Sequence, residues 1–465
     1  MTDTIRCVSP VNGETYAERP VTPDTDVDAA LARARAAQAE WRKLPIFERA
    51  KYCTAATEAM LSMRQEIVPE LAWLMGRPVK FGAGELRGFE ERALHMIDIA
   101  DVALARMDPK PKEGFRRWIT REPLGVVFVI APWNYPYLTA VNSIIPALMA
   151  GNAVILKHAS QTLLVGERFQ AAFDKAGLPA GLFQNLFLSH GQAARILSGG
   201  HVDQVNFTGS VEGGKAMEKA AAGTFTGLGL ELGGKDPAYV RPDCDMTATV
   251  ENLVDGSFFN SGQSCCGIER IYVHKDVFDD FVGGFVDLTR QYVLGDPLDE
   301  ATTIGPMVKP QAADFVRAQI EAAVRGGATA HLDPKDFPAD RPGTAYMAPQ
   351  VLTGVNHQMA VMVEESFGPV VGIMSVSDDE EAIGLMNDSQ YGLTASLWTQ
   401  DLNAAEQIGE RLETGTVFMN RCDYLDPALA WTGVKDTGRG ATLSRVGYET
   451  LTRPKSWHMR PSFAG

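Results

Sequence analysis

The hydrophobic residues of the first hundred positions follow a helical pattern. The alanine-rich stretch 26–41 and the segments at about 47–63 and 85–104 have the periodicity of amphipathic helices. A further helical run stops at Gly76-Arg77-Pro78, where glycine and proline end a helix. We therefore expect the N-terminal quarter of the chain to consist of packed helices.

Short apolar runs replace this pattern after residue 115. The segment 115–121 alternates bulky and polar side chains, as an exposed strand does, and 126–130 is a continuous apolar run of the buried parallel type. Two further buried strands are expected at 153–156 and 205–207, separated from it by helical segments. Strands that alternate with helices predict a doubly wound α/β unit. A second α/β unit is expected from about Leu230, with strands at 238–240, 271–273, 370–374, 395–398 and 417–419 and a helix at 310–325.

Polar residues follow three of these strands directly. Asn134 lies in a Pro-Trp-Asn-Tyr-Pro turn, Lys157 ends the second run, and Ser210 opens a helix after the third. Ligands of doubly wound sheets bind at the carboxyl ends of the strands, so these side chains are expected at a binding site. The alternatives are a turn-forming asparagine and ordinary polar residues at strand ends. The Gly-Ser pair before the helix lacks the GxGxxG pattern and is a weak signal alone.

Length and composition narrow the class of protein. The 465 residues exceed one ordinary core, so two or three domains are expected. The net charge of −15 argues against a nucleic acid or an anionic membrane as a partner. Six cysteines without CxxC spacing and an N-terminus without an apolar signal core predict free thiols and a cytoplasmic protein. The eight histidines show no metal-ligand spacing, so no catalytic metal is expected.

Two adjacent cysteines, Cys265 and Cys266, follow a Ser-Gly-Gln turn and precede an apolar run. A glycine turn that presents a thiol at the edge of a sheet suits a nucleophile, and we expect Cys265 to attack a carbonyl carbon. Buried structural cysteines are the alternative. Glu231 lies between two leucines just before paired glycines, an unusual place for a solvated carboxylate. A helix cap or a surface residue is the alternative for Glu231.

Five motifs occur in a fixed order and together resemble the aldehyde dehydrogenase superfamily. They are Pro-Trp-Asn-Tyr-Pro, Phe-Thr-Gly-Ser, Leu-Glu-Leu-Gly-Gly-Lys, Ser-Gly-Gln-Ser-Cys and Glu-Glu-Ser-Phe-Gly-Pro, and the resemblance runs from about residue 9 to residue 455. It implies oxidation of an aldehyde to a carboxylic acid through a cysteine thiohemiacetal and a thioester, with hydride transfer to NAD or NADP and hydrolysis by water. A CoA-acylating relative or a reductase, and a catalytically silent binding protein on the same fold, are the alternatives.

The resemblance assigns roles to the catalytic residues. Cys265 matches the nucleophile, and Cys266 matches a neighbour without a direct role. Glu231 matches the general base that activates the hydrolytic water, and Asn134 matches the side chain that forms the oxyanion hole with the backbone N–H of Cys265. CoA-acylating relatives generally lack a base at the position of Glu231, which favours water as the acyl acceptor. A thiol is mostly protonated at neutral pH, so a nearby carboxylate has a proton to accept.

The resemblance also implies an NAD or NADP site. Its residues are Trp133, Lys157, Ser160, Gly209, Ser210, Glu365 and Phe367. Lys157 and Ser160 match positions beside the adenosine ribose, and Gly209-Ser210 matches the helix start near the pyrophosphate. Glu365 matches the nicotinamide ribose ligand, and Phe367 matches a residue that packs near the ring. The family often has glutamate where this chain has Ser160, and serine does not repel a 2′-phosphate, so NADP is expected to be accepted alongside NAD.

The loop 420–433 has the family's usual length but unusual content. In the family this loop lines the substrate entrance together with residues after the Asn134 turn. The residues expected to contact the substrate are Tyr135, Leu138, Asn142, Arg421, Tyr424, Asp426 and Trp431. Arg421 is a candidate for binding the carboxylate of a semialdehyde, and loop packing with surface charge is the alternative.

The resemblance further implies two Rossmann-like α/β domains and a small β arm for oligomerisation. We expect the cofactor domain at 1–104 and 124–230, the catalytic domain at 231–449, and the arm at 105–123 and 450–465. An antiparallel edge of this kind can pair with another subunit. A homodimer or a homotetramer that acts on a small-molecule aldehyde is therefore expected.

Overall fold

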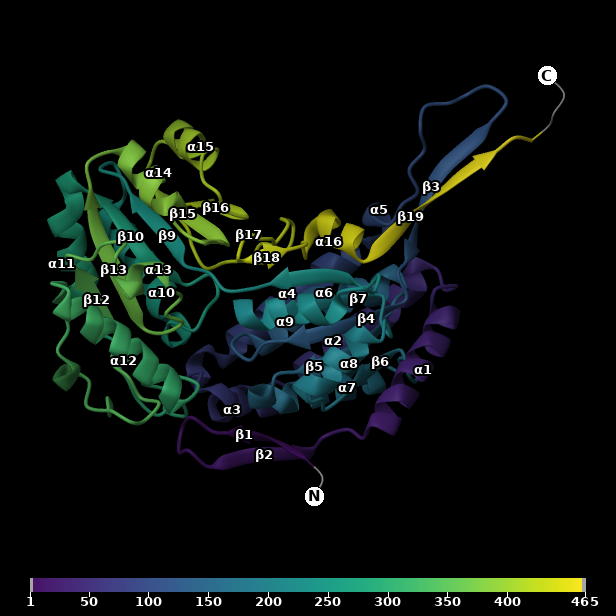
Figure 1. The fold of residues 1–465 in the computed structure, drawn as a ribbon, viewed down its shortest axis with the longest axis horizontal. Coiled ribbons are helices and arrows are strands. Elements are labelled where there is room, and N and C mark those ends of the chain that lie inside the picture. Colours follow the sequence, from purple (N-terminus) through teal and green to yellow (C-terminus); the bar gives the residue numbers. More distant parts are fainter. Residues whose placement is uncertain (1–2, 462–465) are drawn as a thin grey trace.

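The computed structural model describes residues 3–461 and has two α/β lobes and a strand pair that projects away from them (Figure 1). The predicted doubly wound α/β fold is confirmed in both lobes. The first lobe has a six-stranded sheet in the order β18 (Gly438–Arg439), β8 (Gly227–Glu231), β7 (Gln204–Thr208), β4 (Val126–Ala131), β5 (Ala153–His158) and β6 (Phe183–Asn185). Strands β4 to β8 run parallel and β18 runs antiparallel. Every residue of β4 and β5 is buried, as continuous apolar runs predict.

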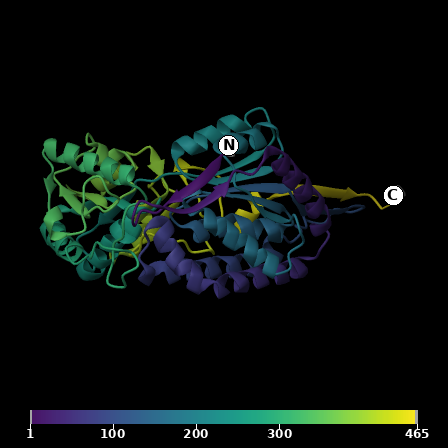
Figure 2. The same ribbon diagram turned by 90° about the horizontal axis from the view of Figure 1, so that it is seen from below.

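Helices lie on both faces of this sheet (Figures 1 and 2). The predicted segment 85–104 begins earlier than expected, at Val79, because Pro78 precedes the helix and its fixed φ suits a helix start; it then breaks near Ile99. The helices of this lobe are α1 Asp24–Trp41, α2 Ile46–Ser62, α3 Arg64–Met75, α4 Val79–Asp98, α5 Ala100–Ala103, α6 Pro136–Ala150, α7 Leu163–Lys175, α8 His190–Ser198 and α9 Val211–Ala221, with a 3₁₀ turn η1 Ser160–Thr162.

An N-terminal hairpin, β1 (Thr4–Val8) with β2 (Thr15–Pro20), is not predicted by the sequence pattern. Most of its side chains are exposed, so it lacks the apolar run that marks the buried strands. The hairpin lies across the first lobe and reaches toward the second (Figure 2). There the Tyr346 hydroxyl donates to the backbone carbonyl of Val11 at 3.3 Å.

The second lobe has a seven-stranded sheet in the order β11 (Thr329–Ala330), β12 (Gln350–Thr353), β13 (Val370–Val376), β10 (Ile268–His274), β9 (Asp236–Val240), β15 (Thr394–Trp398) and β16 (Thr416–Met419). All neighbours are parallel except β11 with β12. The five predicted strands of this lobe are all present. Its helices are α10 Met246–Phe258, α11 Phe278–Thr289, α12 Pro310–Arg325, α13 Ala360–Val363, α14 Asp379–Asn387 and α15 Leu402–Gly409, with a short strand pair β14 Tyr391–Gly392 and β17 Val434–Lys435.

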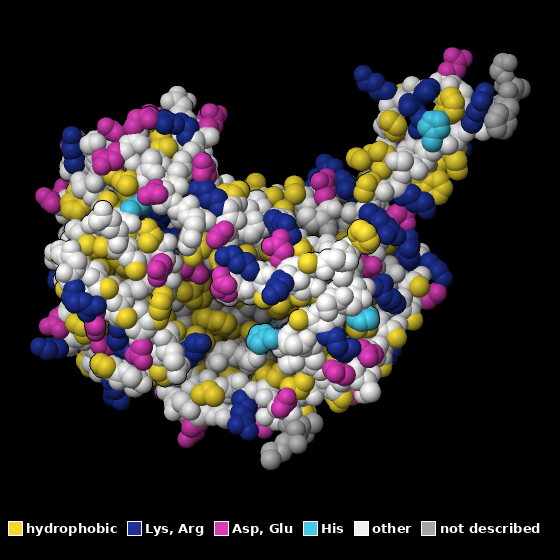
Figure 3. All heavy atoms as spheres, viewed as in Figure 1, with side chains coloured by type: hydrophobic (Ala, Val, Ile, Leu, Met, Phe, Trp, Pro, Cys, Tyr) yellow, Lys and Arg dark blue, Asp and Glu magenta, His cyan; other side chains and the backbone are white. Residues whose placement is uncertain are grey.

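The two sheets present opposite ends to one cavity. Asn134, Lys157 and Ser210 reach it from the carboxyl ends of β4, β5 and β7. Gly233, Cys265 and Glu365 reach it from segments that precede the amino ends of β9, β10 and β13. On the face drawn in Figure 3, the surface is hollowed between the two lobes, and hydrophobic side chains lie in the hollow.

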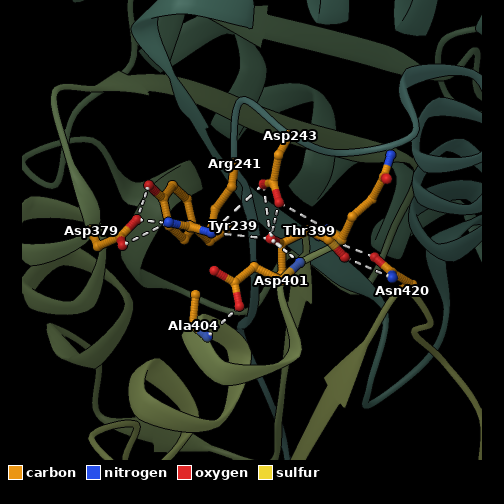
Figure 4. Close-up of polar contacts among 9 residues, drawn as sticks. Tyr239, Arg241, Asp243, Asp379, Thr399, Asp401, Ala404 and Asn420 are labelled. Carbon is orange, nitrogen blue, oxygen red and sulfur yellow. Dashed lines mark hydrogen bonds and ion pairs between the residues drawn. The ribbon is translucent and has the colours of Figure 1, made fainter.

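The carboxyl end of the second sheet is closed by its own side chains. Strand order reverses between β9 and β15, the place where doubly wound sheets usually bind ligands. Arg241 follows β9 and forms an ion pair with Asp379, and Thr399 follows β15 and donates to Asp243 at 2.8 Å (Figure 4). Asn420, in the left-handed region at φ 53°, binds the backbone of Thr399 with two hydrogen bonds.

The projecting strand pair is β3 (Arg116–Pro123) with β19 (Thr452–Met459), which are antiparallel along their full length. Trp118 and Trp457 stack across it with ring centroids 5.3 Å apart. A short helix, α16 Ser444–Thr450, leads into β19. Residues 462–465 of the predicted arm lie outside the described residues. Within residues 3–461, no helix combines the length and apolar content that a membrane span requires.

Candidate active site

One cavity of about 1180 Å³ lies between the two sheets. It brings together almost every residue that the sequence singles out. The predicted site residues that line it are Trp133, Asn134, Tyr135, Leu138, Asn142, Lys157, Ser160, Gly209, Ser210, Glu231, Cys265, Glu365, Phe367, Tyr424 and Trp431. Arg421 and Asp426 are not part of this lining.

The loop that carries Cys265 has an unusual backbone. Asn260, Ser261 and Gly262 adopt left-handed φ values of 55°, 58° and 69°, which cost energy for the two residues that have a side chain. The Asn260 side chain stabilises this conformation, because its amide donates to the carbonyls of Asn134 at 3.3 Å and Gln263 at 3.1 Å. The loop then delivers Cys265, half-buried, to the cavity wall, while the neighbouring Cys266 is buried.

The paired glycines before β9 allow the nucleophile loop to approach closely. A Cβ atom on Gly234 would lie 2.2 Å from the backbone carbonyl oxygen of Cys265, which no side chain can do. A Cβ on Gly233 would lie 2.5 Å from a carboxylate oxygen of Glu365. The Gly-Gly motif therefore brings Glu365 and the Cys265 loop close to the strand that follows Glu231.

Asn134 lies in the turn between β4 and α6 and points at the nucleophile loop. Its side-chain Nδ2 donates to the Gln263 carbonyl at 3.2 Å, and its own carbonyl accepts from Arg77 at 2.6 Å. An amide nitrogen has two hydrogens, so one remains available for another acceptor. The backbone N–H of Cys265 donates to no other residue within 3–461. These two donors suit an oxyanion that forms next to the sulfur.

A buried ion pair supports this turn from behind. Arg77 and Glu85 are 2% and 1% exposed, and their side chains form a salt bridge. Glu85 also accepts the backbone N–H groups of Tyr137 and Leu138, at 3.0 and 3.1 Å, in the first turn of α6. Helix α6 has no side-chain cap of its own, so Glu85 caps it by accepting these N–H groups. Its negative charge also stabilises the positive end of the helix dipole.

Glu231 is the last residue of β8, and two hydroxyls hold its carboxylate. Thr208 Oγ1 donates to one oxygen at 3.0 Å, and Thr442 Oγ1 donates to the other at 2.6 Å. Burial raises the pKa of Glu231, while the bonds from Thr442 and Thr208 and the cation of Arg92 act in the opposite direction. A carboxyl with a raised pKa is a stronger base than one in water, which suits proton transfer from a thiol or a water.

The end of the cavity below β5 and β7 fits a dinucleotide. Lys157 is buried, and burial lowers the pKa of its ammonium. Within residues 3–461 no side chain pairs with it, so we expect it to bind a polar or anionic group of a ligand. Ser210 caps α9 by accepting from Gly213 N at 3.2 Å, and the first turn of this helix opens on the cavity beside Gly209. A pyrophosphate is a ligand for such a helix start.

The part of the cavity lined by Glu365 and Phe367 suits the ribose and the flat ring of a dinucleotide. Glu365 accepts the Gly234 N–H at 2.9 Å. Burial raises the pKa of Glu365 to about 7, and the nearby Glu269 carboxylate acts in the same direction. Phe367, at φ 51°, packs edge to face on Trp133 with ring centroids 5.7 Å apart. Glu269 holds this segment by accepting the N–H groups of Ser366 and Phe367, both at 2.8 Å.

The substrate end of the cavity is formed by α4, α6 and the loop 420–433. Tyr424 donates to Glu91 at 2.8 Å, and the guanidinium of Arg421 stacks 3.4 Å from the centroid of the Tyr424 ring. This stacking keeps Arg421 at the surface. Two cations of α4 line this part of the cavity, the exposed Arg87 and the buried Arg92. Arg92 donates to the Leu138 carbonyl and to Asn142.

Several residues of the site escape the motifs of the sequence. Arg77, Glu85 and Arg92 belong to a helical region without an obvious chemical signal, and Asp423 belongs to a loop without a recognisable pattern. The Gly-Arg-Pro sequence indicates only a boundary between two helices at Arg77 and gives no sign of a functional role. Among the described residues, no cluster of three or more histidine, cysteine or acidic side chains is arranged to hold a metal ion.

Comparisons with known proteins agree with this geometry. Residues 1–457 match the model of the aldehyde dehydrogenase family. A succinate-semialdehyde dehydrogenase [NADP(+)] of Mycobacterium avium is 33% identical over 464 residues, which cover 99% of this chain and 98% of that protein.

Solved structures give the same result. The succinic semialdehyde dehydrogenase of Streptococcus pyogenes, solved with NADP+, superimposes with a TM-score of 0.93 at 27% identity, covering 98% of this chain and 100% of that one. The NAD-dependent aldehyde dehydrogenase of Sinorhizobium meliloti superimposes with a TM-score of 0.94 at 30% identity, covering 98% and 92%. The chain therefore belongs to the aldehyde dehydrogenase family and is an NAD(P)-dependent oxidoreductase that acts on aldehydes.

Proposed function

We propose that this enzyme oxidises a carboxylated aldehyde, a semialdehyde, to the diacid, with Cys265 as nucleophile, Glu231 as general base and Asn134 as oxyanion donor. The observation that carries the catalytic part is the convergence of these three side chains on one cavity from three separate parts of the chain. Replacing Cys265 by serine is the direct test. We expect activity to fall by at least about a thousandfold, and full activity in the variant would overturn the assignment.

Each residue has one chemical task in this proposal. The Cys265 sulfur bonds to the aldehyde carbon, and its proton passes to Glu231 directly or through water. The carbonyl oxygen becomes an oxyanion that accepts hydrogen bonds from Asn134 Nδ2 and the Cys265 N–H. NAD(P), when bound, accepts the hydride that leaves this carbon. Glu231 passes the first proton to solvent and then takes a proton from water, whose oxygen adds to the thioester carbon. The carbon–sulfur bond breaks, the departing sulfur takes the proton back from Glu231, and the acid leaves with the thiol restored.

Glu231 also distinguishes this proposal from acyl transfer to CoA. A carboxylate held by Thr208 and Thr442 beside the cavity is a base for water, which a CoA-acylating enzyme does not need. Incubation with an aldehyde, NADP and CoA is expected to yield the free acid. Acyl-CoA as the main product contradicts the proposal.

The cation for the substrate carboxylate is proposed to be Arg92. Within residues 3–461, only one of its terminal nitrogens has acceptors, Leu138 O at 2.8 Å and Asn142 Oδ1 at 3.4 Å. Burial lowers the pKa of this guanidinium, and the carboxylates of Glu85, Glu231 and Glu91 offset only part of this effect, so a further anion beside Arg92 stabilises its charge. The names of the relatives from Mycobacterium avium and Streptococcus pyogenes support a semialdehyde as the substrate class. The earlier candidate, Arg421, instead stacks on Tyr424 outside the cavity.

Two aldehydes of similar length test the substrate class. Succinic semialdehyde carries the carboxylate and butanal does not. We expect Arg92→Met to lower kcat/KM for succinic semialdehyde by about a hundredfold, the worth of a lost charge-assisted contact, with a much smaller effect on butanal. Arg421→Ala is the matched control and is expected to leave the ratio of the two rates unchanged. An unchanged ratio in Arg92→Met, or a collapsed ratio in Arg421→Ala, contradicts the assignment to Arg92.

Both cofactors are used in this family, and we propose that this enzyme accepts NADP alongside NAD. Ser160 and the buried ammonium of Lys157 leave room and positive charge for a 2′-phosphate. Comparing kcat/KM for the two cofactors tests this. A preference for NAD beyond about a thousandfold, roughly 4 kcal/mol, contradicts it.

We further propose the domain roles expected from the sequence: residues 1–104 and 124–230 bind the cofactor, 231–449 carry catalysis, and 105–123 with 450–465 form an oligomerisation arm. Support comes from the projecting β3–β19 pair and from the free edge of β16, where Val417 is exposed. A homodimer or homotetramer in the cytoplasm, where the six free thiols stay reduced, is the corresponding assembly. Light scattering after chromatography tests it, and a monomer contradicts it.

A further inference from the structure

A buried carboxylate connects the substrate loop to the nucleophile loop. Asp423 belongs to the loop 420–433, and one of its oxygens accepts hydrogen bonds from the Ser264 hydroxyl at 3.0 Å and the Cys266 thiol at 2.9 Å. These two donors flank Cys265 on either side in the chain. Asp423 itself has a left-handed φ of 49° and lines the cavity. Such a strained position persists only where surrounding contacts fix it.

The same loop is anchored at both of its ends. At its start, Asn420 donates to the Thr399 carbonyl at 2.8 Å, and the carboxylate of Asp243 in turn holds the Thr399 hydroxyl (Figure 4). At its end, the backbones of Trp431 and Thr442 exchange two hydrogen bonds of 2.9 Å. Thr442 is the residue whose hydroxyl donates to Glu231. The substrate loop is thus tied to the base at one end and to the nucleophile loop through Asp423.

We propose that Asp423 is a positioning residue: it holds the Cys266 thiol and the Ser264 hydroxyl as hydrogen-bond donors, so that only the sulfur of Cys265 is free to react in the cavity. The inference rests on the proposed role of Cys265 as the nucleophile. A sulfur that donates to a carboxylate at 2.9 Å is fixed in rotamer and stays protonated, whereas the thiolate is the reactive form. Adjacent thiols would otherwise compete for the same electrophile.

The hydrogen bonds that Asp423 accepts from Cys266 and Ser264 are strongest when its carboxylate is ionised. Burial raises its pKa to about 6; the bonds from Cys266 and Ser264 and the cation of Arg77 oppose this shift, and Asp255 of α10 adds to it. Tyr135 also faces the carboxyl from the turn before α6. Above about pH 6 the carboxylate accepts from both donors. Below it, one oxygen carries a proton and the tie to the nucleophile loop weakens.

Alkylation of the enzyme without cofactor or substrate measures this role directly. Iodoacetamide is added across pH 5 to 8, and the modified cysteine is located by peptide mass spectrometry. In the native enzyme we expect Cys265 to be alkylated with little modification of Cys266, and the preference to decline below about pH 6. In Asp423→Asn we expect the ratio of Cys265 to Cys266 modification to fall by about tenfold, as for one lost charged hydrogen bond, and its pH dependence near 6 to vanish.

Asp426→Asn is the matched control, because Asp426 is exposed in the same loop and its carboxylate accepts, within residues 3–461, only from the Ala428 N–H. It is expected to behave as the native enzyme. If Asp423→Asn does not fold, Ser264→Ala removes one donor to Asp423 and is expected to lower the same ratio by a smaller factor. Native ratios and native pH profiles in both variants overturn the inference. Loss of the nucleophile assignment has a different signature, since Cys265→Ser would then stay active.

Discussion

Replacing Glu85 by alanine is expected to destabilise the fold and to slow catalysis together. The carboxylate of Glu85 faces Arg77 and the start of α6, and all of these groups are buried. The variant leaves the guanidinium of Arg77 in a site with 2% exposure and without its ion-pair partner. It also removes the acceptor from two backbone N–H groups of the first turn of α6.

The size of the effect follows from these contacts. Removing one partner of a buried ion pair costs about 3–5 kcal/mol, because an uncompensated charge remains. We take this range as the whole effect, since Glu85 and Leu138 line the cavity, so that water can take the place of the removed carboxylate. Arg77 holds the carbonyl of Asn134 at 2.6 Å, and a displacement of this turn by about 1 Å is expected to lower kcat by about a hundredfold.

Urea unfolding at fixed protein concentration and steady-state kinetics measure the two effects. Glu90→Gln is the control, because Glu90 lies on the same helix and has no ion pair among the described residues. In the double variant Arg77→Met with Glu85→Leu, both charges of this pair are removed, so we expect most of the stability to return without the activity. A loss below about 1 kcal/mol in Glu85→Ala, or a double variant as unstable as the single one, refutes this reasoning.

Four further outcomes are expected. Asn134→Ala should lower kcat by about 10²–10³ with little change in KM, as for other oxyanion donors, and an unchanged kcat speaks against that role. Ser160→Glu should lower kcat/KM for NADP by at least about tenfold and spare NAD, since it adds like charge beside the 2′-phosphate; equal losses contradict this. Burial raises the pKa of Glu365 to about 7, so KM for the cofactor should rise as pH falls through 7 and the carboxylate is neutralised; Glu365→Gln should abolish this dependence, and an unchanged profile contradicts it. Thr442→Val removes a donor to the ionised form of Glu231, so the pH at which hydrolysis becomes fast should move upward, and a downward shift disproves the contact's role.

The sequence predicts those parts of the fold that have a local signal. The apolar runs of β4 and β5 are visible as runs because both faces of these strands are buried. Strand β8 has no such run, because glycines at 227 and 229 interrupt it. The helix start at Val79 and the exposed hairpin β1–β2 likewise lack the pattern that would mark them.

Some residues of the candidate site can be predicted from the sequence, and others cannot. Residues in short motifs, such as Cys265 and Asn134, are found from the sequence because their neighbours repeat the family pattern. Residues that act through distant contacts are not. Asp423 and Ser264 are 159 positions apart and meet only in the folded chain. Arg421 shows the opposite case, in which a plausible charge in the right loop is held on an aromatic ring away from the cavity.

Trapping the acyl-enzyme tests the central claim most directly. In Glu231→Gln, thioester formation is expected to continue with water as a proton acceptor, while hydrolysis becomes slow. Mixing this variant with succinic semialdehyde and NADP should give a burst of about one reduced cofactor per subunit and a succinyl group on Cys265, seen in the intact mass and in the mapped peptide. No burst and no adduct, or an adduct on Cys266 or Cys422 instead, contradicts the account.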